Sequence, residues 1–521
     1  MKPSECFEVA RIRLTVITPV FIGSRLGILY PMEFFFYQNQ VYVVNEEKLG
    51  RFLIEKNLMD KFINEAFSGN LRRDGILQFI QKNTGGSNLP NLMSLSSYSV
   101  PGGSAKMGEF RPFIRDGLNR IYIPGTSIKG VMRTAVLYNV VKNNIGSWEK
   151  KIDEQIKEAR NRERGKTFSS EMQKSFLQSF TLAGSPVNDQ NKDILRCLIV
   201  RDAYPIGKPE VKVIPIRVLC KRKEGNFYWS TGSSRNGEIV IWVEAVVGGI
   251  FETEIVWDYA LYQKFSEKNR TLPVTCIKDV LKCVSQMQTD VMKHEIEFFK
   301  VKKSSDIADS AASSLRNWYQ NALNGSWLRI GYGSGMLSTT VDLLWNESLR
   351  QKIRNICGKD RRDDPAPKSR RVWQRNDVQC FPVGWMKLEV SYGKSGENWE
   401  IVEPPVKVEL PPGESGDSIQ KQISEDSARG ITASLKISSR ELISAQTSSK
   451  PVQKGQTRQG ILIREGDKWV ARFEGDDRLA EIENQGKIPD AAKSESVAEF
   501  YIVAQSKQKG IIARFQKLIN K

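Results

Sequence analysis

The stretch FIRDGLNRIYIPGTSIKGVMRTA, residues 113–135, decides how the central part of this chain folds. Asp116-Gly117 predicts a turn, and residues 121–123 (IYI) predict a short strand. Pro124-Gly125 ends that strand, and apolar residues at helical spacing follow it. The stretch is therefore read as a strand, a tight turn and a helix in direct succession.

The start of that helix is a candidate anion site. Thr126 or Ser127 is placed to cap the helix, and Gly125 precedes them. Lys129 and Arg133 follow one turn apart. Unpaired backbone N–H groups and the helix dipole both attract a phosphate to such a position. The alternative is an ordinary capped surface helix whose cations are solvated.

A second glycine-rich stretch, WLRIGYGSGML (residues 327–337), follows a long region of helical spacing. It predicts a short strand that enters a loop with glycines at 331, 333 and 335. No Gly-Lys-Ser/Thr follows, so the loop is not a Walker loop and no nucleotide cofactor is expected. Two interpretations remain open: a tight turn that needs positive φ, or a side-chain-free surface that a ligand backbone can approach.

Positive charge gathers between residues 348 and 375, which hold ten Lys or Arg and three acids. Lys368, Arg370 and Arg371 lie at its end, before the predicted strand 384–390. The segment is either a solvated basic loop or an electrostatic contact for a polyanion or a neighbouring subunit.

Residues 7–16 alternate apolar and polar side chains, which predicts a half-buried strand. The strand runs into a loop, residues 18–24 (TPVFIGS), whose Val20 and Phe21 favour the core. Gly23 and Ser24 are the members of this loop that we expect near a ligand.

Composition limits the possible functions. The chain has 521 residues and a formal net charge of +18, which points to a polyanionic partner. Residues 401–521 carry 19 basic and 17 acidic side chains, so the first 400 residues carry +16 of that charge.

The chain has a single His, and none of its seven cysteines forms a C-x-x-C pair. This composition argues against catalysis by a pair of histidines and against a zinc site. No apolar stretch is long enough to span a membrane and no secretory signal is apparent, so we expect a cytoplasmic protein with reduced thiols.

Together, TPVFIGS, YIPGTSIKGVMRTA, LRIGYGSG, PKSRR and PVGWMKLEV resemble the motifs of CRISPR-associated RAMP proteins. Their order and spacing look most like the family of fifth subunits of type III-A (Csm) complexes, which cap the crRNA 3′-proximal end. The match covers roughly residues 8–391. The resemblance implies ferredoxin-like (RRM-like) βαββαβ units, neighbouring RAMP subunits as partners, and crRNA held by its phosphates and 2′-hydroxyls. It also implies a part in crRNA maturation and antiviral defence, with a separate host nuclease limited or recruited.

The expected fold class is α+β, with tandem ferredoxin-like RAMP domains and a small C-terminal β-barrel. We predict a first RAMP domain with an inserted helical arm, a second with the glycine-rich loop and PKSRR, a linker, and an OB-like or SH3-like barrel. Their respective ranges are 1–257, 258–403, 404–456 and 457–521.

Catalysis is not expected. RNA cleavage needs positioned acid–base groups or a metal held by carboxylates. His294 lies in a predicted amphipathic helix. Asp116 and Asp202 are the carboxylates nearest the glycine-rich motifs, but Asp116 lies in an Asp-Gly turn and no second carboxylate accompanies it. The leading hypothesis is therefore a non-catalytic RNA-binding subunit without metal or cofactor. A RAMP endoribonuclease that processes CRISPR transcripts is the runner-up, and a protein–protein adaptor is a third possibility.

Overall fold

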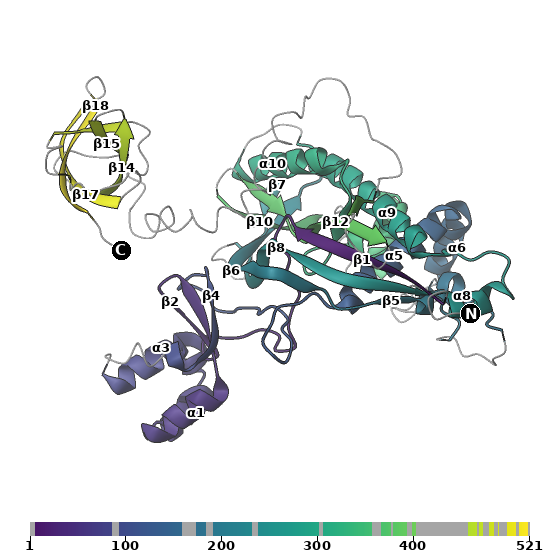
Figure 1. Ribbon diagram of the computed structural model, residues 1–521, viewed down its shortest axis with the longest axis horizontal. Coiled ribbons are helices and arrows are strands. Elements are labelled where there is room, and N and C mark those ends of the chain that lie inside the picture. Colours follow the sequence, from purple (N-terminus) through teal and green to yellow (C-terminus); the bar gives the residue numbers. More distant parts are fainter. Residues whose placement is uncertain are drawn as a thin grey trace. The chain divides into compact units, whose positions relative to one another are not determined.

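The computed structural model describes most of the first 402 residues and parts of the last 65 (Figure 1). The described ranges are 6–85, 93–158, 173–183, 191–231, 238–301, 306–356, 366–376, 379–392, 399–402, 457–465, 468–472, 479–483, 488, 497–506 and 510–518. The chain divides into two compact units, Met1–Gly416 and Asp417–Lys521. The expected linker, residues 404–456, lies outside the described residues.

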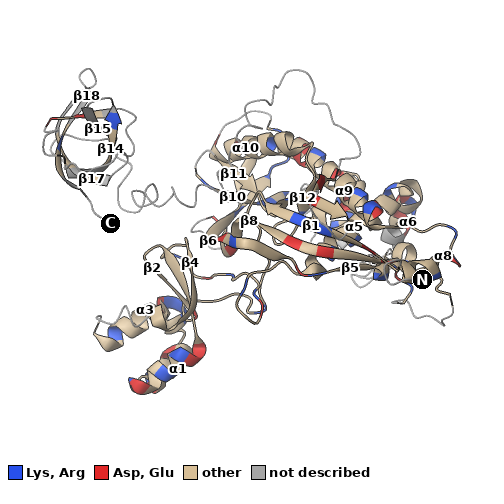
Figure 2. Ribbon diagram, viewed as in Figure 1, with Lys and Arg blue, Asp and Glu red and all other residues tan. Residues whose placement is uncertain are grey.

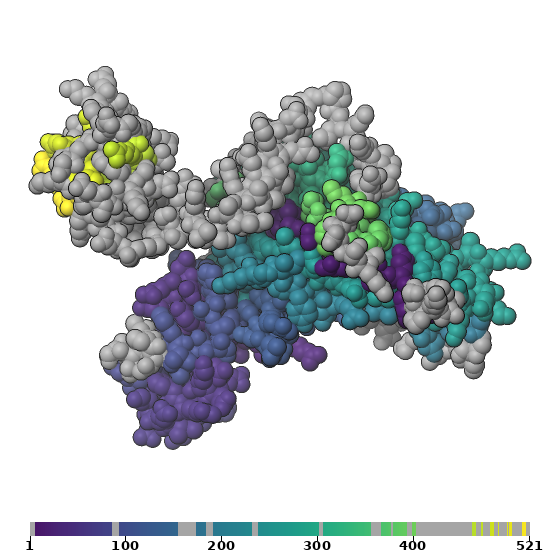
Figure 3. All heavy atoms as spheres, viewed as in Figure 1, coloured from purple at the N-terminus to yellow at the C-terminus, as the bar shows by residue number. Residues whose placement is uncertain are grey.

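A ten-stranded sheet forms the centre of the first unit, in the order β11-β10-β6-β8-β1-β12-β13, with β5, β7 and β9 paired to its members. The strands are β1 (Phe7–Val16), β5 (Leu198–Val200), β6 (Tyr204–Lys221), β7 (Phe227–Trp229), β8 (Val240–Asp258), β9 (Trp327–Arg329), β10 (Ser369–Gln374), β11 (Cys380–Pro382), β12 (Trp385–Tyr392) and β13 (Glu400–Ile401). The first strand lies between β8 and β12, and purple atoms of β1 lie beside green atoms of β12 in Figure 3.

Alternation along β1 places its residues on two different faces of the sheet. Ala10, Ile12 and Leu14 are fully buried under the helices. Arg11 and Arg13 point to the other face, where both pair with Glu252 of β8. Figure 2 shows these charges as blue on β1 next to red on β8.

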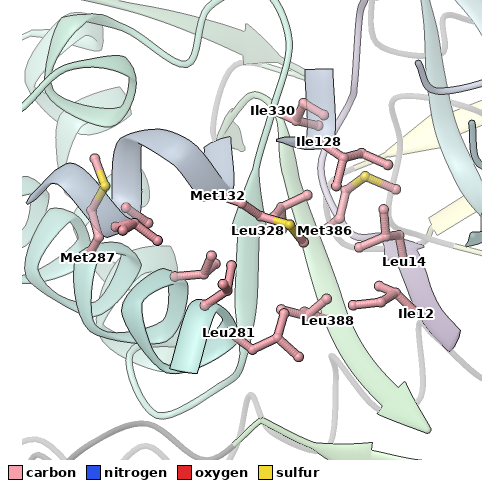
Figure 4. Close-up of a cluster of buried hydrophobic side chains, with 14 of the residues drawn as sticks. Ile12, Leu14, Ile128, Met132, Leu281, Met287, Leu328, Ile330, Met386 and Leu388 are labelled. Carbon is pink, nitrogen blue, oxygen red and sulfur yellow. The ribbon is translucent and has the colours of Figure 1, made fainter. Parts of the chain in front are cut away.

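Helices cover the face of the sheet that carries the main core. They are α5 (Gly125–Lys142), α6 (Ile145–Glu158), α8 (Tyr259–Ser266), α9 (Ile277–Phe298), α10 (Ile307–Ala322), α11 (Met336–Thr339) and α12 (Glu347–Ile356). Figure 4 shows Ile128 and Met132 of α5 and Leu281 of α9 in one cluster with Leu14 and Leu388 of the strands. Residues far apart in the sequence therefore share one core.

The start of α5 differs from the sequence prediction. Pro124 is the N-cap residue, and neither Thr126 nor Ser127 caps the helix. Instead Asp202, from the segment before β6, accepts a hydrogen bond of 2.7 Å from the Gly125 N–H. A Cβ atom on Gly125 would lie 2.3 Å from the carbonyl oxygen of Val200, so glycine is required here by close packing.

A second, three-stranded sheet also belongs to the first unit. It is formed by β2 (Phe34–Tyr37), β3 (Gln40–Val44) and β4 (Ser96–Pro101), together with α1 (Glu46–Glu55), α2 (Met59–Phe67) and α3 (Asn70–Thr84). Residues 87–108 are rich in Ser, Gly and Pro, which is typical of a loop, yet Ser96–Pro101 within this stretch pairs with β3.

The α+β class is confirmed by this mixture of helices and antiparallel sheets. The expected boundary at residue 257 does not separate two sheets, because β1 pairs with both β8 and β12. Strands from both expected RAMP domains therefore belong to one sheet in the first compact unit.

The second unit contains a closed sheet in the order β14-β15-β16-β18-β17. Its strands are β14 (Thr457–Glu465), β15 (Lys468–Arg472), β16 (Leu479–Ile482), β17 (Val497–Ser506) and β18 (Gly510–Leu518). The β16–β18 pair is parallel and the others are antiparallel. Its core includes Leu462, Phe500 and Phe515. The shortest of these strands is β16, with four residues.

Within the described residues, none of the helices has the length and apolar character needed to cross a membrane. The described cysteines form no disulfide.

Candidate functional site

The glycine-rich loop after β9 packs closely against the rest of the first unit. Gly331, Gly333 and Gly335 have φ angles of 86°, 88° and 79°, which favour glycine. A Cβ atom on Gly331 would lie 2.4 Å from the Phe21 carbonyl oxygen, and one on Gly333 would lie 2.5 Å from Cγ2 of Val383. At Gly335 the nearest atom is 4.0 Å away. Internal packing thus explains the first two glycines, and only Gly335 leaves an open main-chain surface.

The loop of residues 18–24 holds the glycine-rich loop in place. The Tyr332 N–H donates to the Phe21 carbonyl oxygen at 2.8 Å, and the two rings meet edge to face at 5.8 Å. The Trp385 N–H donates to Oγ1 of the buried Thr18 at 3.0 Å. Val20 and Phe21 are buried, as their apolar character predicted. The motifs TPVFIGS, LRIGYGSG and PVGW therefore meet in space, although the first lies more than 300 residues before the other two.

Two arginines surround the ring of Tyr332 at the surface. Arg371 of β10 donates from Nε to the Tyr332 hydroxyl at 2.9 Å, and its guanidinium lies 4.9 Å from the ring centroid. The guanidinium of Arg111 lies 5.7 Å from the same centroid and also pairs with Glu109 at 3.5 Å. Arg371 is exposed and Tyr332 is half-buried. We call Tyr332, Arg111 and Arg371 the Tyr332 group.

A buried arginine holds the glycine-rich loop from the core side. Arg329 of β9 is 3% exposed. Its Nε donates to the Val383 carbonyl oxygen at 3.2 Å, and its two terminal nitrogens donate to Ser338 Oγ at 3.2 Å and to the Gly333 carbonyl oxygen at 3.4 Å. Because these acceptors lie within the loop, on α11 directly after it and on the turn before β12, Arg329 acts as a positioning residue for Tyr332.

A buried carboxylate fixes the segment that carries Arg111. Glu244 of β8 is fully buried and accepts from the Phe113 N–H at 2.9 Å and from the Tyr98 hydroxyl at 3.3 Å. It also forms an ion pair with Arg115. Burial raises the pKa of Glu244, and the charge of Arg115 opposes that rise. This carboxylate joins β4, β8 and the segment before α5.

The two predicted cations at the start of α5 have partners inside the protein. Lys129 is half-buried and donates from Nζ to the Leu198 carbonyl oxygen at 2.6 Å. Burial lowers the pKa of Lys129. Arg133 forms an ion pair of 2.7 Å with Asp193 and also donates to Gln173. Both cations therefore stabilise the fold around α5, and Thr126 is the exposed group at this helix start.

The basic segment before β11 divides between surface and core. Arg370 is 7% exposed and its Nε donates to Glu295 of α9 at 2.8 Å, so the prediction of a ligand contact at Arg370 is wrong. The cause is strand alternation in β10, which turns Arg370 inward and Arg371 outward. Lys368 is half-buried, and its carbonyl oxygen accepts from the Lys221 N–H at 2.8 Å.

Gly23 and Ser24 lie at the outer end of the loop that contacts Tyr332. Gly23 pairs with Phe113, and the Ser24 N–H donates to the Pro112 carbonyl oxygen at 3.1 Å. This loop therefore links the glycine-rich loop to the segment before α5. Sequence reasoning missed Arg111 and Arg329; the only available signal was a cation inside an otherwise apolar stretch.

A ring flanked by guanidinium groups beside an accessible main chain is an arrangement suited to single-stranded nucleic acid, which offers phosphates and stackable bases. The fold and this surface thus define an α+β protein with a surface suited to nucleic acid. Residues 13–338 match the model of the RAMP superfamily. The chain belongs to the RAMP superfamily.

Two curated relatives are described as "CRISPR system Cms protein Csm5". The chain is 29% identical to the one from Streptococcus thermophilus over 151 residues, which is 26% of this chain and 40% of the relative. It is 23% identical to the one from Methanocaldococcus jannaschii over 407 residues, which is 72% of this chain and 88% of the relative.

Two solved structures are also similar. One is a chain in the cryo-EM structure of a Csm–crRNA–target RNA ternary complex of a type III-A CRISPR-Cas system, with 23% identity, a TM-score of 0.45, and coverage of 73% of this chain and 100% of that one. The other is the crystal structure of T. onnurineus Csm5, with 22% identity, a TM-score of 0.45, and coverage of 72% and 99%.

Proposed function

We propose that this protein is a non-catalytic crRNA-binding subunit of a type III-A CRISPR (Csm) effector ribonucleoprotein. In this role it caps the 3′-proximal end of the crRNA beside neighbouring RAMP subunits. It contributes to crRNA maturation and antiviral defence by limiting or recruiting a separate nuclease. Membership of the RAMP superfamily and similarity to one curated Csm5 protein over 72% of the chain support this proposal.

The Tyr332 group is the observation that carries the proposal. Four motifs from distant parts of the sequence converge to present one aromatic ring, two guanidinium groups and the open main chain at Gly335. Contacts of this kind read phosphates and base faces without reading base identity. A protein that must accept any guide sequence needs that property.

The acid–base groups of the first unit also favour a binding role. Burial lowers the pKa of His294 to about 4, so its imidazole is neutral at pH 7. Asp116 accepts hydrogen bonds from the Leu118 and Arg120 N–H groups and from the Arg120 side chain. These bonds lower the pKa of Asp116 and occupy its oxygens. Among the described residues, no three His, Cys, Asp or Glu side chains cluster in a way that could hold a metal ion.

For the second unit we propose an OB-like barrel rather than an SH3-like one. Its closed strand order contains one parallel pair, β16–β18, which fits a Greek-key barrel better than a simple meander.

The test of the proposal is binding of single-stranded RNA by the Arg111→Ala/Arg371→Ala double variant over a salt series. We expect weaker binding and a salt slope reduced by about 1.4, because each phosphate contact on a single strand contributes about 0.7. Arg51→Ala is the control, since Arg51 lies on α1 and its side chain is 74% exposed.

An unchanged affinity and slope in the double variant would contradict the site. The same protein is incubated with labelled repeat RNA with and without Mg²⁺, and we expect the RNA to remain intact. Cleavage that Asp116→Ala or His294→Ala abolishes would instead establish an endoribonuclease.

A further inference from the structure

Two tyrosines form a stacked pair next to the start of α5. The rings of Tyr122 and Tyr204 lie 5.8 Å apart with an interplanar angle of 22°. The guanidinium of Arg120 lies 5.1 Å from the centroid of the Tyr204 ring. Tyr204 is 38% exposed, and the Arg120 side chain is 58% exposed. This is an aromatic and guanidinium stack at the surface.

The backbone holds the pair in a defined register. Ile123 and Ala203 exchange hydrogen bonds of 2.9 and 2.8 Å, so the two segments run antiparallel at this point. Residues at opposite positions of such a pair point to the same face and contact each other. Asp202 also holds the Gly125 N–H at 2.7 Å. The tyrosines are therefore preorganised rather than free to rotate apart.

The surroundings of the pair differ from those of the Tyr332 group in charge. Arg120 is paired with Asp116 at 2.8 Å, and the neighbouring Arg201 is paired with Glu254 at 3.0 Å. The carboxylates here balance the guanidinium groups, so the local field is poor for attracting a phosphate. Stacking needs no net charge, because every base presents a flat π face.

We propose that Tyr122, Tyr204 and Arg120 form a platform that stacks an unpaired base of single-stranded RNA. This inference rests on the proposed RNA-binding function and adds a second contact of different chemistry. The Tyr332 group takes the phosphates of the strand, and the tyrosine platform takes a base. Tyrosine rings and guanidinium planes are the side chains on which splayed RNA bases stack.

The position of the platform relative to the Tyr332 group supports one continuous strand path. The loop of residues 18–24 contacts Tyr332 through Phe21 and pairs with Phe113 through Gly23. Arg25 follows this loop and lies close enough to influence the charge state of Tyr122. From Phe21 to Arg25 the chain spans at most about 14 Å, so both contacts are within reach of one short oligonucleotide.

The experiment uses a single-stranded RNA that carries 2-aminopurine at successive positions, bound to the full chain. In the wild-type protein we expect stacking to quench the fluorescence of one position. Tyr204→Ala and Tyr122→Ala are expected to restore that fluorescence and to weaken binding by about tenfold, with an unchanged salt slope. Tyr204→Phe keeps the ring and should retain both the quenching and the affinity.

The matched control is Tyr392→Ala, because Tyr392 is 37% exposed and lies at the end of β12. Thermal melting of each variant checks that the fold is intact.

If the tyrosine variants bind RNA like the wild type while Arg111→Ala/Arg371→Ala binds weakly, the platform is refuted and the proposed function stands. If the wild type shows no salt-dependent RNA binding, both are refuted. If Tyr204→Ala prevents association with other subunits in the absence of RNA and leaves RNA affinity unchanged, the surface is a protein interface and the platform is refuted.

Discussion

At the scale of single residues, the position of a cation in the strand pattern decides its role. Arg370 and Arg371 are adjacent in the sequence, yet one forms a buried ion pair with Glu295 and the other flanks Tyr332 at the surface. Arg329 is buried as well, and its guanidinium is held by three uncharged acceptors. Guanidinium groups in this protein thus support the glycine-rich loop from the core, and we propose that those at the surface contact the ligand.

Arg329→Met is expected to destabilise the first unit by about 2–4 kcal/mol. The substitution removes three hydrogen bonds and leaves the buried Gly333 and Val383 carbonyl groups without this donor. The free energy of unfolding from urea denaturation measures the effect. Arg51→Met at the exposed surface of α1 is the control and should change stability by less than about 0.5 kcal/mol.

The Arg329→Lys variant distinguishes the support that Arg329 gives to the loop from the effect of its positive charge. Lysine keeps the positive charge but lacks the planar fork that reaches three acceptors. We expect RNA affinity to fall in both variants, because Tyr332 is no longer held in place. Wild-type RNA affinity in a folded Arg329→Met protein would show that Arg329 does not position the loop.

At the scale of elements, α9 combines a broad apolar face with buried polar groups. Burial would raise the pKa of Glu295, but the charge and hydrogen bonds of Arg370 outweigh this effect and lower it. Burial lowers the pKa of His294 on the same helix to about 4. The two groups therefore affect stability in different pH ranges. The stabilisation from Glu295 is lost only below the ordinary pKa of a glutamate carboxyl, whereas the stabilisation from His294 begins to fall below about pH 6.5.

We expect the stability of the first unit to fall as the pH drops from about 6.5 to about 4. The unfolded chain takes up a proton on His294 near pH 6.5, whereas the folded protein does so only near pH 4. The folded pKa is lower than the unfolded one, so the stabilisation is complete above pH 6.5. The loss reaches at most about 3.5 kcal/mol, at roughly 1.4 kcal/mol for each unit of difference between the two pKa values.

Urea denaturation at pH 7, 6, 5 and 4.5 measures this dependence. His294→Gln removes the titrating group, so its stability should change less over the same interval. An identical pH dependence in wild type and His294→Gln would show that other groups cause the loss.

At the scale of the whole molecule, charge is distributed unevenly between the two units. Met1–Gly416 carries a net charge of +14 and Asp417–Lys521 carries +4. The Tyr332 group and the tyrosine platform both lie in Met1–Gly416. The second unit has its own closed sheet and its own core.

A chain that ends at Gly416 is therefore expected to bind single-stranded RNA with nearly the affinity and salt slope of the full protein. Residues 417–521 hold 18 basic and 14 acidic side chains, so removal of the second unit takes away only four of the eighteen net positive charges. Titration of both proteins with the same oligonucleotide over a salt series measures this. A large loss of slope on truncation would place phosphate contacts in the second unit.

Much of the local structure follows from the sequence. The alternation in β1, the hairpin of β2 and β3 and the helical spacing of α9 depend on neighbouring residues, whose periodicity is visible in one dimension. The glycines at 331, 333 and 335 were recognisable as loop positions for the same reason. The strand expected at residues 121–123 is not formed, and Ile121 and Ile123 make only isolated bridges. Strand β4 was missed because a Ser-, Gly- and Pro-rich segment resembles a loop until a neighbouring strand pairs with it.

The sequence by itself determined the α+β class, the resemblance to RAMP proteins, the excess of positive charge and the motifs that form the site. Only the tertiary structure decided which charges remain available to a ligand. Lys129, Arg133 and Arg370 have acceptors that lie 69, 60 and 75 residues away, at Leu198, Asp193 and Glu295. Arg111 and Tyr332 meet only because separate strands and loops pack together. Burial and pairing of a charge depend on groups that are distant in sequence, so local pattern cannot specify them.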